Sequence, residues 1–263
     1  ARAAVALRAV GITGVNFDLF YGLPHQTVET LLETVSLCAD MAPDRIALFG
    51  YAHVPWMAKK QRLIDESALP GPTARLAQAR AAAEALEGFG YTAIGLDHFA
   101  LPRDPLSIAA RDGTLRRNFQ GYTTDQAQTM LGFGATSIGR TPTTFTQNTT
   151  ETGAWARAVE AGELPLGRGV TLSADDQLRG AVIERLMCQG RVDLNAEAAR
   201  FGLTRDYFRD AEAALDEFSH DGLITYEGGV VTARPAGLQL IRVIASAFDA
   251  YFQESAARHA LAV

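Results

Sequence analysis

The chain has 263 residues, 48% of them hydrophobic and 21% charged, and a formal net charge of −6 at pH 7. This composition is typical of a soluble globular protein with one large domain or two smaller ones. The negative balance gives no bulk attraction to nucleic acid or anionic lipid, no apolar run reaches the roughly 18 to 20 residues of a membrane span, and the N-terminus lacks a signal-peptide layout. We therefore expect a cytoplasmic protein that binds neither nucleic acid nor membrane.

Helices and strands alternate from the N-terminus onward. Residues 1–10 have the pattern of the last turns of an amphipathic helix and lead into an apolar strand at 14–21, a helix at 24–41 and a second strand at 45–51. This alternation is the repeating unit of a parallel α/β sheet or barrel. The two cysteines, Cys38 and Cys188, lie far apart inside apolar helical patterns, which favours buried thiols over a disulfide and leaves no metal ligand to assign.

Two strands cannot close a barrel of eight. Either the chain is part of a longer protein, which we favour, or a smaller sheet is completed by strands at 90–95 and 131–138. The second of these segments contains Gly132 and Gly134, and glycines in strands mark either a bulge or a close approach of the backbone to another group.

Ligands of parallel α/β proteins bind at the carboxyl ends of the strands, and both predicted strands carry unusual residues there. Asp18 lies in the apolar run VNFDLFYG, and a buried carboxylate is costly unless it binds something. The structural alternative is that Asp18 accepts backbone N–H groups at the start of the next helix. The second strand ends in Gly50 and Ala52, which admit a ligand or simply pack under a loop, and His53 is either a site residue or a hydrogen-bonded loop histidine.

Residues 95–124 combine His98, Gln120 and several aromatic side chains with four arginines, which are Arg103, Arg111, Arg116 and Arg117. Only residues 105–117 have a helical pattern, and their flanks are loop-like. Guanidinium groups pair with carboxylates through two parallel hydrogen bonds, so the segment predicts a site for a polyanionic small molecule. The structural alternative is a solvated charged helix followed by an ordinary loop.

Residues 171–263 predict a separate helical domain. Ser173 has the position of an N-cap for a helix to about Gln189, and a short helix at 194–201 and a third helix from Thr204 to about His220 follow. A hairpin and a last helix from Pro235 to about His259 complete a winged-helix-like pattern. Acidic residues outnumber arginines here and lysine is absent, which is the wrong balance for a DNA-binding face, so we expect a packing or lid domain.

Five segments in order carry a family resemblance: DLFYGLP, LFGYAHVP, GLDHFALP, RNFQGYTT and LGFGATSIG. Over essentially its whole length the chain resembles the C-terminal part of the oxygen-independent coproporphyrinogen III dehydrogenases (oxidases), which are radical S-adenosylmethionine enzymes. The resemblance implies an α/β fold in which residues 1–170 form the second half of an incomplete (β/α) barrel with a substrate-facing extension. It also implies radical oxidative decarboxylation of two propionates of coproporphyrinogen III, which gives protoporphyrinogen IX in haem biosynthesis.

By position in the matching motifs, the resemblance implies that Asp18, Ala52 and Ile138 contact S-adenosylmethionine; no catalytic residue is assigned. The four arginines, His98 and Gln120 are our hypothesis for substrate binding. The family's [4Fe–4S] cluster is held by a CxxxCxxC loop that this sequence lacks, so we expect the chain alone to be inactive and to need the missing N-terminal half of the same protein. The alternative is a non-catalytic module that binds haem or another anionic small molecule.

Overall fold

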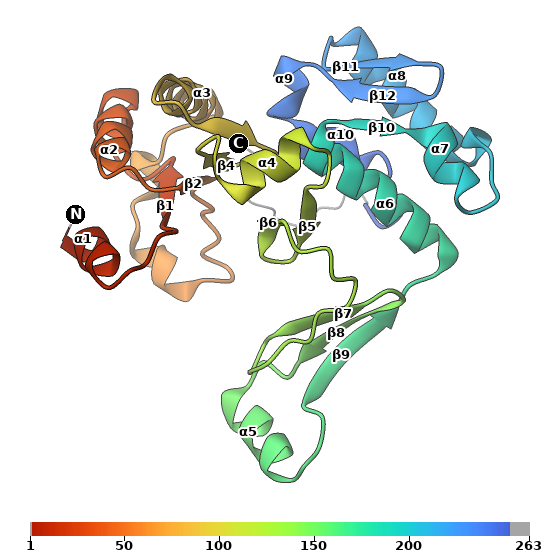
Figure 1. Ribbon diagram of the computed structural model, residues 1–263, viewed down its shortest axis with the longest axis horizontal. Helices are drawn as coiled ribbons and strands as arrows, with labels where there is room; N and C mark the ends of the chain where they lie inside the picture. Colours follow the sequence, from red (N-terminus) through yellow and green to blue (C-terminus); the bar gives the residue numbers. More distant parts are fainter. Residues whose placement is uncertain (1, 253–263) are drawn as a thin grey trace. The chain divides into compact units, whose positions relative to one another are not determined.

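A computed structural model describes residues 2–252 (Figure 1). The chain divides between Thr114 and Leu115 into two compact units, called unit 1 and unit 2 below. Unit 1 contains α1 (Arg2–Ala9), β1 (Asn16–Tyr21), α2 (Val28–Asp40), β2 (Arg45–Gly50), the 3₁₀ helices η1 (Lys59–Leu63) and η2 (Glu66–Ala68), α3 (Pro72–Gly88), β3 (Thr92–Ile94), β4 (His98–Ala100) and α4 (Pro105–Arg111).

Unit 1 is built on a four-stranded sheet with the order β1-β2-β4-β3. β1 and β2 are parallel, which confirms the helix–strand repeat expected from the sequence, whereas β4 is antiparallel to both β2 and β3. The predicted strand at 90–95 therefore belongs to this sheet as β3. The second segment proposed for the sheet, 131–138, does not, and the described residues contain no closed barrel.

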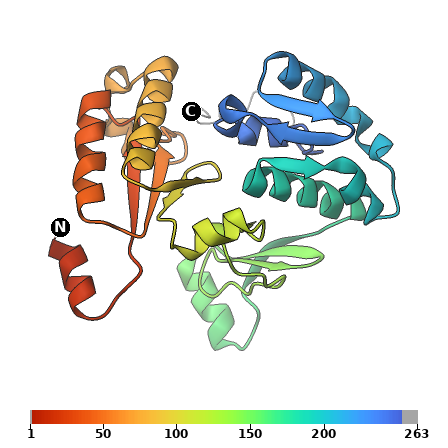
Figure 2. The ribbon, with the colours of Figure 1, turned by 45° about the horizontal axis from the view of Figure 1, so that its top comes forward.

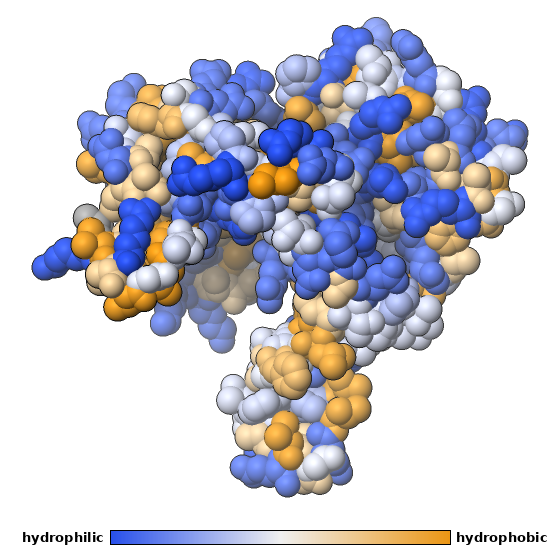
Figure 3. Space-filling view, in the orientation of Figure 1, coloured by the Kyte–Doolittle hydropathy of each residue, from blue (hydrophilic) through white to orange (hydrophobic). Residues whose placement is uncertain are grey.

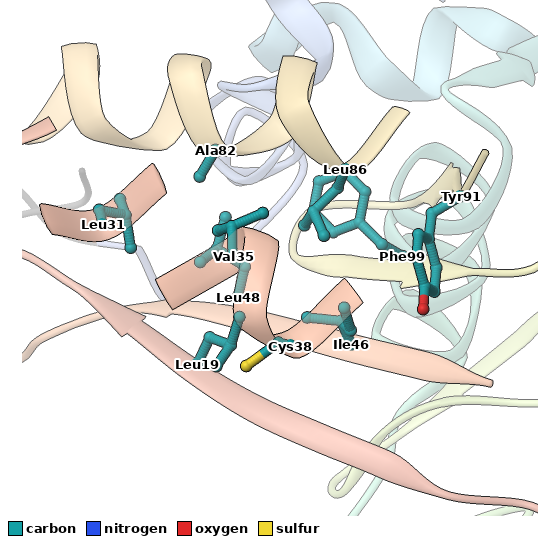
Figure 4. Packing of buried hydrophobic residues seen from close by; sticks show 10 residues of the cluster. All are labelled: Leu19, Leu31, Val35, Cys38, Ile46, Leu48, Ala82, Leu86, Tyr91 and Phe99. Atoms are coloured by element: carbon teal, nitrogen blue, oxygen red, sulfur yellow. The ribbon is translucent and has the colours of Figure 1, made fainter. Parts of the chain in front are cut away.

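The core of unit 1 lies between the sheet and the helices α2 and α3, which Figure 2 shows side by side over the first two strands. Leu31 and Val35 of α2 are fully buried, four residues apart and so on one helix face, and they belong to the same buried cluster as Leu86 of α3 and Ile46 of β2 (Figure 4). α2 begins at Thr27, whose side chain accepts a hydrogen bond from the backbone of the third helical residue, as N-caps do.

The other face of the sheet has a different composition. Because side chains alternate along a strand, Phe17, Leu19 and Tyr21 of β1 face the core, whereas Asn16, Asp18 and Phe20 lie on the opposite face and are exposed. β1 is also one of the two edge strands of this sheet within the described residues, the other being β3.

Unit 2 contains three small sheets and several short helices. Its strands are β5 (Arg116–Asn118), β6 (Gly121–Thr123), β7 (Ile138–Thr141), β8 (Thr144–Asn148), β9 (Leu166–Thr171), β10 (Arg191–Asp193), β11 (Ile224–Glu227) and β12 (Val230–Ala233). Its helices are α5 (Thr152–Glu160), α6 (Ala174–Gln189), α7 (Leu194–Ala199), η3 (Arg205–Ala211), α8 (Glu212–His220), α9 (Pro235–Leu238) and α10 (Ile241–Ser246).

Within unit 2, β7, β8 and β9 form an antiparallel sheet that extends with α5 away from α6 (Figure 1). Large hydrophobic side chains stay exposed on this extension, and Figure 3 shows hydrophobic surface gathered there. They include Leu131, Phe133, Leu164 and Val170.

The helical part of unit 2 agrees with the sequence in most elements. Ser173 caps α6, and its side chain exchanges hydrogen bonds with Asp176. The helix ends at Gly190, whose φ of 63° is the left-handed conformation that glycine adopts without strain. The hairpin of β11 and β12 is confirmed, and β10 joins it to form a three-stranded sheet that the sequence did not indicate.

Three local predictions were wrong. The helix predicted over 105–117 ends at Arg111, and Arg116 and Arg117 lie in β5, which forms a hairpin with β6 in the flank that looked like a loop. The strand predicted over 131–138 begins only at Ile138. The last helix, predicted from Pro235 to about His259, is divided within the described residues into the short helices α9 and α10, and its end beyond residue 252 lies outside them.

Both cysteines are free and buried, as expected. Burial raises the pKa of Cys38, and it raises that of Cys188 to about 12, because a thiolate loses hydration inside the protein. Among the described residues, none of the helices has the length and apolar character that crossing a membrane requires.

Candidate functional site

A row of three residues crosses the sheet of unit 1 on the face opposite α2 and α3. The register pairs Asp18 of β1 with Ala47 of β2, and Ala47 with His98 of β4. Residues paired in register lie on the same face of a sheet, so the carboxylate and the imidazole flank a small alanine. The row supplies an acceptor and a titratable ring with little side-chain bulk between them.

The burial predicted for Asp18 was wrong, because its side chain is exposed. Its Oδ1 accepts a hydrogen bond of 2.8 Å from Nδ2 of Asn16. The apolar run around Asp18 gave the wrong impression because the neighbours Phe17 and Leu19 point to the core while Asp18 points away from it. The alternative role at the next helix also fails, since Thr27 caps α2.

His98 is oriented by its neighbours. Its Nδ1 lies 2.6 Å from Oδ1 of Asp97, a hydrogen-bonding distance. Its ring makes an edge contact with Phe49 at 6.1 Å between centroids, and Phe49 lies 6.0 Å from Phe20. The ordered imidazole thus lies beside aromatic surface on the same face as Asp18.

The carboxyl end of β2 leads into a hydrogen-bonded loop. Ala52 is exposed, and its carbonyl oxygen accepts a hydrogen bond of 3.0 Å from Nε2 of Gln61. His53 lies between Tyr51, with an Oη–Nδ1 distance of 3.3 Å, and Glu66, with an Nε2–Oε1 distance of 3.1 Å. The hydrogen-bonded alternative for His53 is therefore the observed one. Its partner Glu66 is 13 positions away in the sequence, so the sequence alone did not indicate the pair.

The four predicted arginines do not form one cluster within a unit. Arg103 and Arg111 belong to unit 1, their side chains are 72% and 67% exposed, and they make long ion pairs of 3.4 Å with Asp44 and 3.5 Å with Asp112. Such surface pairs contribute little to stability.

The other two arginines belong to unit 2 and have partners of different kinds. Arg116 pairs with Glu184 of α6 through Nε and Nη2, at 2.8 and 3.3 Å. The guanidinium of Arg117 lies over the ring of Tyr122 at 5.5 Å. Both arginines line a cavity of about 80 Å³, together with Arg140 of β7, which was not among the predicted binding residues.

The two remaining predicted residues also lie in unit 2. Gln120 is exposed in the turn between β5 and β6, where its backbone N–H donates to Oδ1 of Asn118 at 2.8 Å. Ile138 is half-buried at the start of β7, opposite Gln147 of β8. A Cβ on Gly132 would lie 2.8 Å from the carbonyl oxygen of Ile138, so this glycine is needed for the close approach of two backbone segments.

Residues 2–252 contain no group of three or more His, Cys, Asp or Glu side chains arranged to hold a metal ion. Within them, the chemistry available for a ligand is therefore of three kinds: the polar row on the sheet of unit 1, the loop after β2, and the arginine-lined cavity of unit 2.

Comparison with known proteins gives a consistent result. No protein-family model matches the chain. The chain is 45% identical over 257 residues to oxygen-independent coproporphyrinogen III oxidase from Bradyrhizobium diazoefficiens, covering 98% of this chain and 57% of that protein. It is 40% identical over 254 residues to the protein of the same name from Thermostichus vulcanus, covering 96% of this chain and 78% of that protein.

A solved structure agrees with these relatives. Coproporphyrinogen III oxidase from Escherichia coli, a radical SAM enzyme, matches with a TM-score of 0.91 and 36% identity, over 95% of this chain and 58% of that chain. The chain thus spans little more than half the length of the Bradyrhizobium and Escherichia proteins.

Proposed function

The chain belongs to the oxygen-independent coproporphyrinogen III oxidase family, and on that premise we propose that it is part of an enzyme that decarboxylates two propionates of coproporphyrinogen III to vinyl groups, giving protoporphyrinogen IX. The observation that carries the proposal is the agreement in sequence and fold over nearly the whole chain, at 36 to 45% identity and a TM-score of 0.91. A cytoplasmic location is part of the proposal.

The fold assignment follows from the same premise. We propose that residues 1–170 are the second half of an incomplete (β/α) radical SAM barrel with a substrate-facing extension, and that residues 171–263 are a winged-helix-like domain. The parallel pair of β1 and β2 supports the first part, since parallel strands joined by a helix build such barrels. The order of α6, α7, α8 and the β11–β12 hairpin supports the second.

We propose that Asp18, Ala52 and Ile138 contact S-adenosylmethionine, which supplies the oxidising radical when it is bound. An exposed carboxylate on an otherwise apolar strand can hold the cofactor's amino or ribose groups, and a half-buried isoleucine offers apolar surface to its adenine. The exposed backbone at Ala52 admits a planar group without a side-chain clash.

The [4Fe–4S] cluster does not fit the residues of this chain. A cluster of this type with one open iron needs three thiolates, and the chain has two cysteines, one in each unit, both buried. We therefore propose that the cluster loop lies in a preceding part of a longer protein.

The substrate carries four propionates and requires cationic partners. We propose that His98, Gln120 and the predicted arginines bind the substrate, with the arginines in unequal roles. Arg103 and Arg111 are exposed and contribute long-range attraction, Arg116 is already paired with Glu184, and Arg117 has a guanidinium directed to a ligand cavity.

A chimera tests the proposal directly. The chain is joined behind the N-terminal part of the Bradyrhizobium protein, purified without oxygen, and supplied with S-adenosylmethionine, a chemical reductant and coproporphyrinogen III. We expect protoporphyrin IX after oxidation of the product, detected by fluorescence after chromatography, and none from the chain alone.

Two controls make the result decisive. The same chimera with serines in the CxxxCxxC loop must lose both its brown cluster absorbance and its product. A folded chimera that shows cluster absorbance and cleaves S-adenosylmethionine but leaves coproporphyrinogen unchanged would overturn the proposed function.

A further inference from the structure

The cavity of about 80 Å³ in unit 2, called the Arg117–Arg140 cavity below, has an unusual wall. It lies between β5, the segment after β6, the start of β7 and the side of α6. Apart from Ala127 and Met130 every lining residue is polar or charged, and three of them are arginines. The remaining lining residues are Asn118, Thr123, Asp125, Gln128, Thr129 and Glu184.

Two hydrogen-bond donors in this wall lack a partner. Among residues 2–252, the buried side-chain nitrogen and oxygen atoms without a hydrogen bond are Nε of Arg117 and Nε of Arg140. Both residues line the same cavity, although they lie on different sheets. Buried donors are nearly always paired because an unpaired one loses its hydration without compensation, so this coincidence indicates that an acceptor belongs between them.

The charges of the wall favour an anion as that acceptor. Glu184 is engaged by Arg116 and by the backbone N–H of Arg117, and Oδ1 of Asp125 accepts the N–H of Ala127 at 2.8 Å. Within the described part of the chain, the ion pairs include none with Arg117 or Arg140. The cavity thus presents two guanidinium charges with no protein carboxylate assigned to them.

The two guanidinium groups are also held in place. That of Arg117 lies over the ring of Tyr122 at 5.5 Å, and that of Arg140 lies over the ring of Phe145 at 5.6 Å. A ring face attracts the guanidinium charge but offers no lone pair to its N–H groups. The in-plane donors therefore remain available for a planar anion.

We propose that the Arg117–Arg140 cavity binds one carboxylate, and that this carboxylate is a propionate of the tetrapyrrole substrate. The guanidinium fork matches a carboxylate through two parallel hydrogen bonds, and a volume of about 80 Å³ holds a carboxylate end group but not a whole tetrapyrrole or nucleoside. The identity of the ligand rests on the proposed function, whereas the existence of the carboxylate site does not. Arg140 is the residue that this assignment adds.

The test uses the 263-residue chain and coproporphyrin III, the oxidised and stable tetracarboxylate, followed by porphyrin absorbance and fluorescence. Arg117→Gln and Arg140→Gln are each expected to weaken binding at least about tenfold, while Arg209→Gln, an exposed arginine of the same unit, leaves it unchanged. The tetramethyl ester of coproporphyrin III is expected to bind the parent and both variants equally weakly.

The glutamine variants are expected to fold, because each removes a buried unpaired donor. If a glutamine variant loses thermal stability, the lysine variant at the same position, Arg117→Lys or Arg140→Lys, is used instead. Lysine keeps the charge but lacks the planar fork, so these variants are also expected to weaken coproporphyrin binding. The proposal would be overturned if the folded variants bound coproporphyrin III as tightly as the parent does, or if the parent bound the tetramethyl ester as tightly as coproporphyrin III.

Two further titrations separate this proposal from the proposed function. In the first, propionate is added and the melting temperature is measured. If propionate stabilises the parent but neither variant, and the parent does not bind coproporphyrin, the carboxylate site stands and the tetrapyrrole is not its ligand. If the two variants lose affinity for S-adenosylmethionine and keep it for coproporphyrin, the cavity takes the cofactor's carboxylate and the propionate assignment is wrong.

Discussion

Glu184 of α6 accepts two hydrogen bonds from the guanidinium of Arg116, at 2.8 and 3.3 Å, and a third from the backbone N–H of Arg117 at 3.1 Å. Donating these hydrogen bonds to the Glu184 carboxylate raises the pKa of Arg116. One side chain of α6 thus fixes the position of β5 and leaves the guanidinium of Arg117 to a different partner.

Glu184→Gln should therefore destabilise the protein. The amide keeps the size of the side chain but loses the charge that a bidentate guanidinium pairs with. We expect the free energy of unfolding to fall by about 1 to 2 kcal/mol, the lower part of the range for such bonds, because Arg116 is one-third exposed and solvent screens the pair. Urea unfolding measures it, with the exposed Glu217→Gln as control, expected within about 0.5 kcal/mol of the parent. Equal midpoints for the two variants would contradict the pairing.

Asp18→Asn should leave stability nearly unchanged, within about 0.5 kcal/mol, because the carboxylate is exposed and bonded only locally to Asn16. In the chimera described above, S-adenosylmethionine affinity should fall by about 1 to 3 kcal/mol, the scale of a charge-assisted hydrogen bond. Calorimetric titration measures this, and Glu33→Gln on the exposed side of α2 serves as the control. A large drop in melting temperature with unchanged affinity would show that Asp18 is a structural residue.

Gly237→Ala and Gly180→Ala should have opposite effects. A Cβ on Gly237 would lie 2.0 Å from the carbonyl oxygen of Leu223, a backbone atom that cannot move alone, so we expect a loss of about 1 to 3 kcal/mol as in other overpacked cores. Gly180 lies inside α6 with nothing within 4 Å of such a Cβ, and alanine there should add about 0.5 to 1 kcal/mol. Thermal unfolding of the pair checks both signs at once, and a stabilised Gly237→Ala variant would refute the packing of α9 against Leu223.

The Cys188 thiol should resist alkylation at pH 8 to 9. Burial raises its pKa to about 12, so the reactive thiolate is scarce in the folded state, whereas an unfolded cysteine has a pKa of about 8.5. The buried neutral thiol contributes its full stability to the folded state below the unfolded pKa. This contribution is lost as the pH rises toward about 12, because the unfolded thiol ionises first. Mass spectrometry after iodoacetamide should find Cys188 modified only when urea is present. Rapid labelling of the native protein would show that the site opens to solvent.

The sequence correctly predicted elements in which apolar residues repeat over several turns or in which a capping residue marks the start. α2 and α6 were predicted because their apolar positions repeat over several turns and because Ser173 precedes two aspartates. The parallel pair of β1 and β2 followed from the helix between them. The boundary predicted at residue 170 stays a prediction.

The errors arose where the environment of a residue depends on distant parts of the chain. The apolar run around Asp18 could not reveal that β1 lies at a sheet edge, where alternate side chains meet solvent. β5 has three residues, too few for a period, and its partner Glu184 lies 67 to 68 positions away. Arg140 stood beside the motif that drew attention to Ile138, but only folding places it in a cavity with Arg117.

The edge position of β1 has a consequence for handling the protein. Within the described residues, β1 pairs with β2 on one side only, so the backbone N–H and C=O groups on its other side have no partner strand. Such a row of groups can pair with a strand from another molecule. Phe20, 47% exposed, adds an apolar contact to that template, while the charge of Asp18 in the middle of the strand opposes stacking of identical copies. For this chain studied alone, we therefore expect the neutral variant Asp18→Asn to aggregate at a lower concentration than the parent, which light scattering measures.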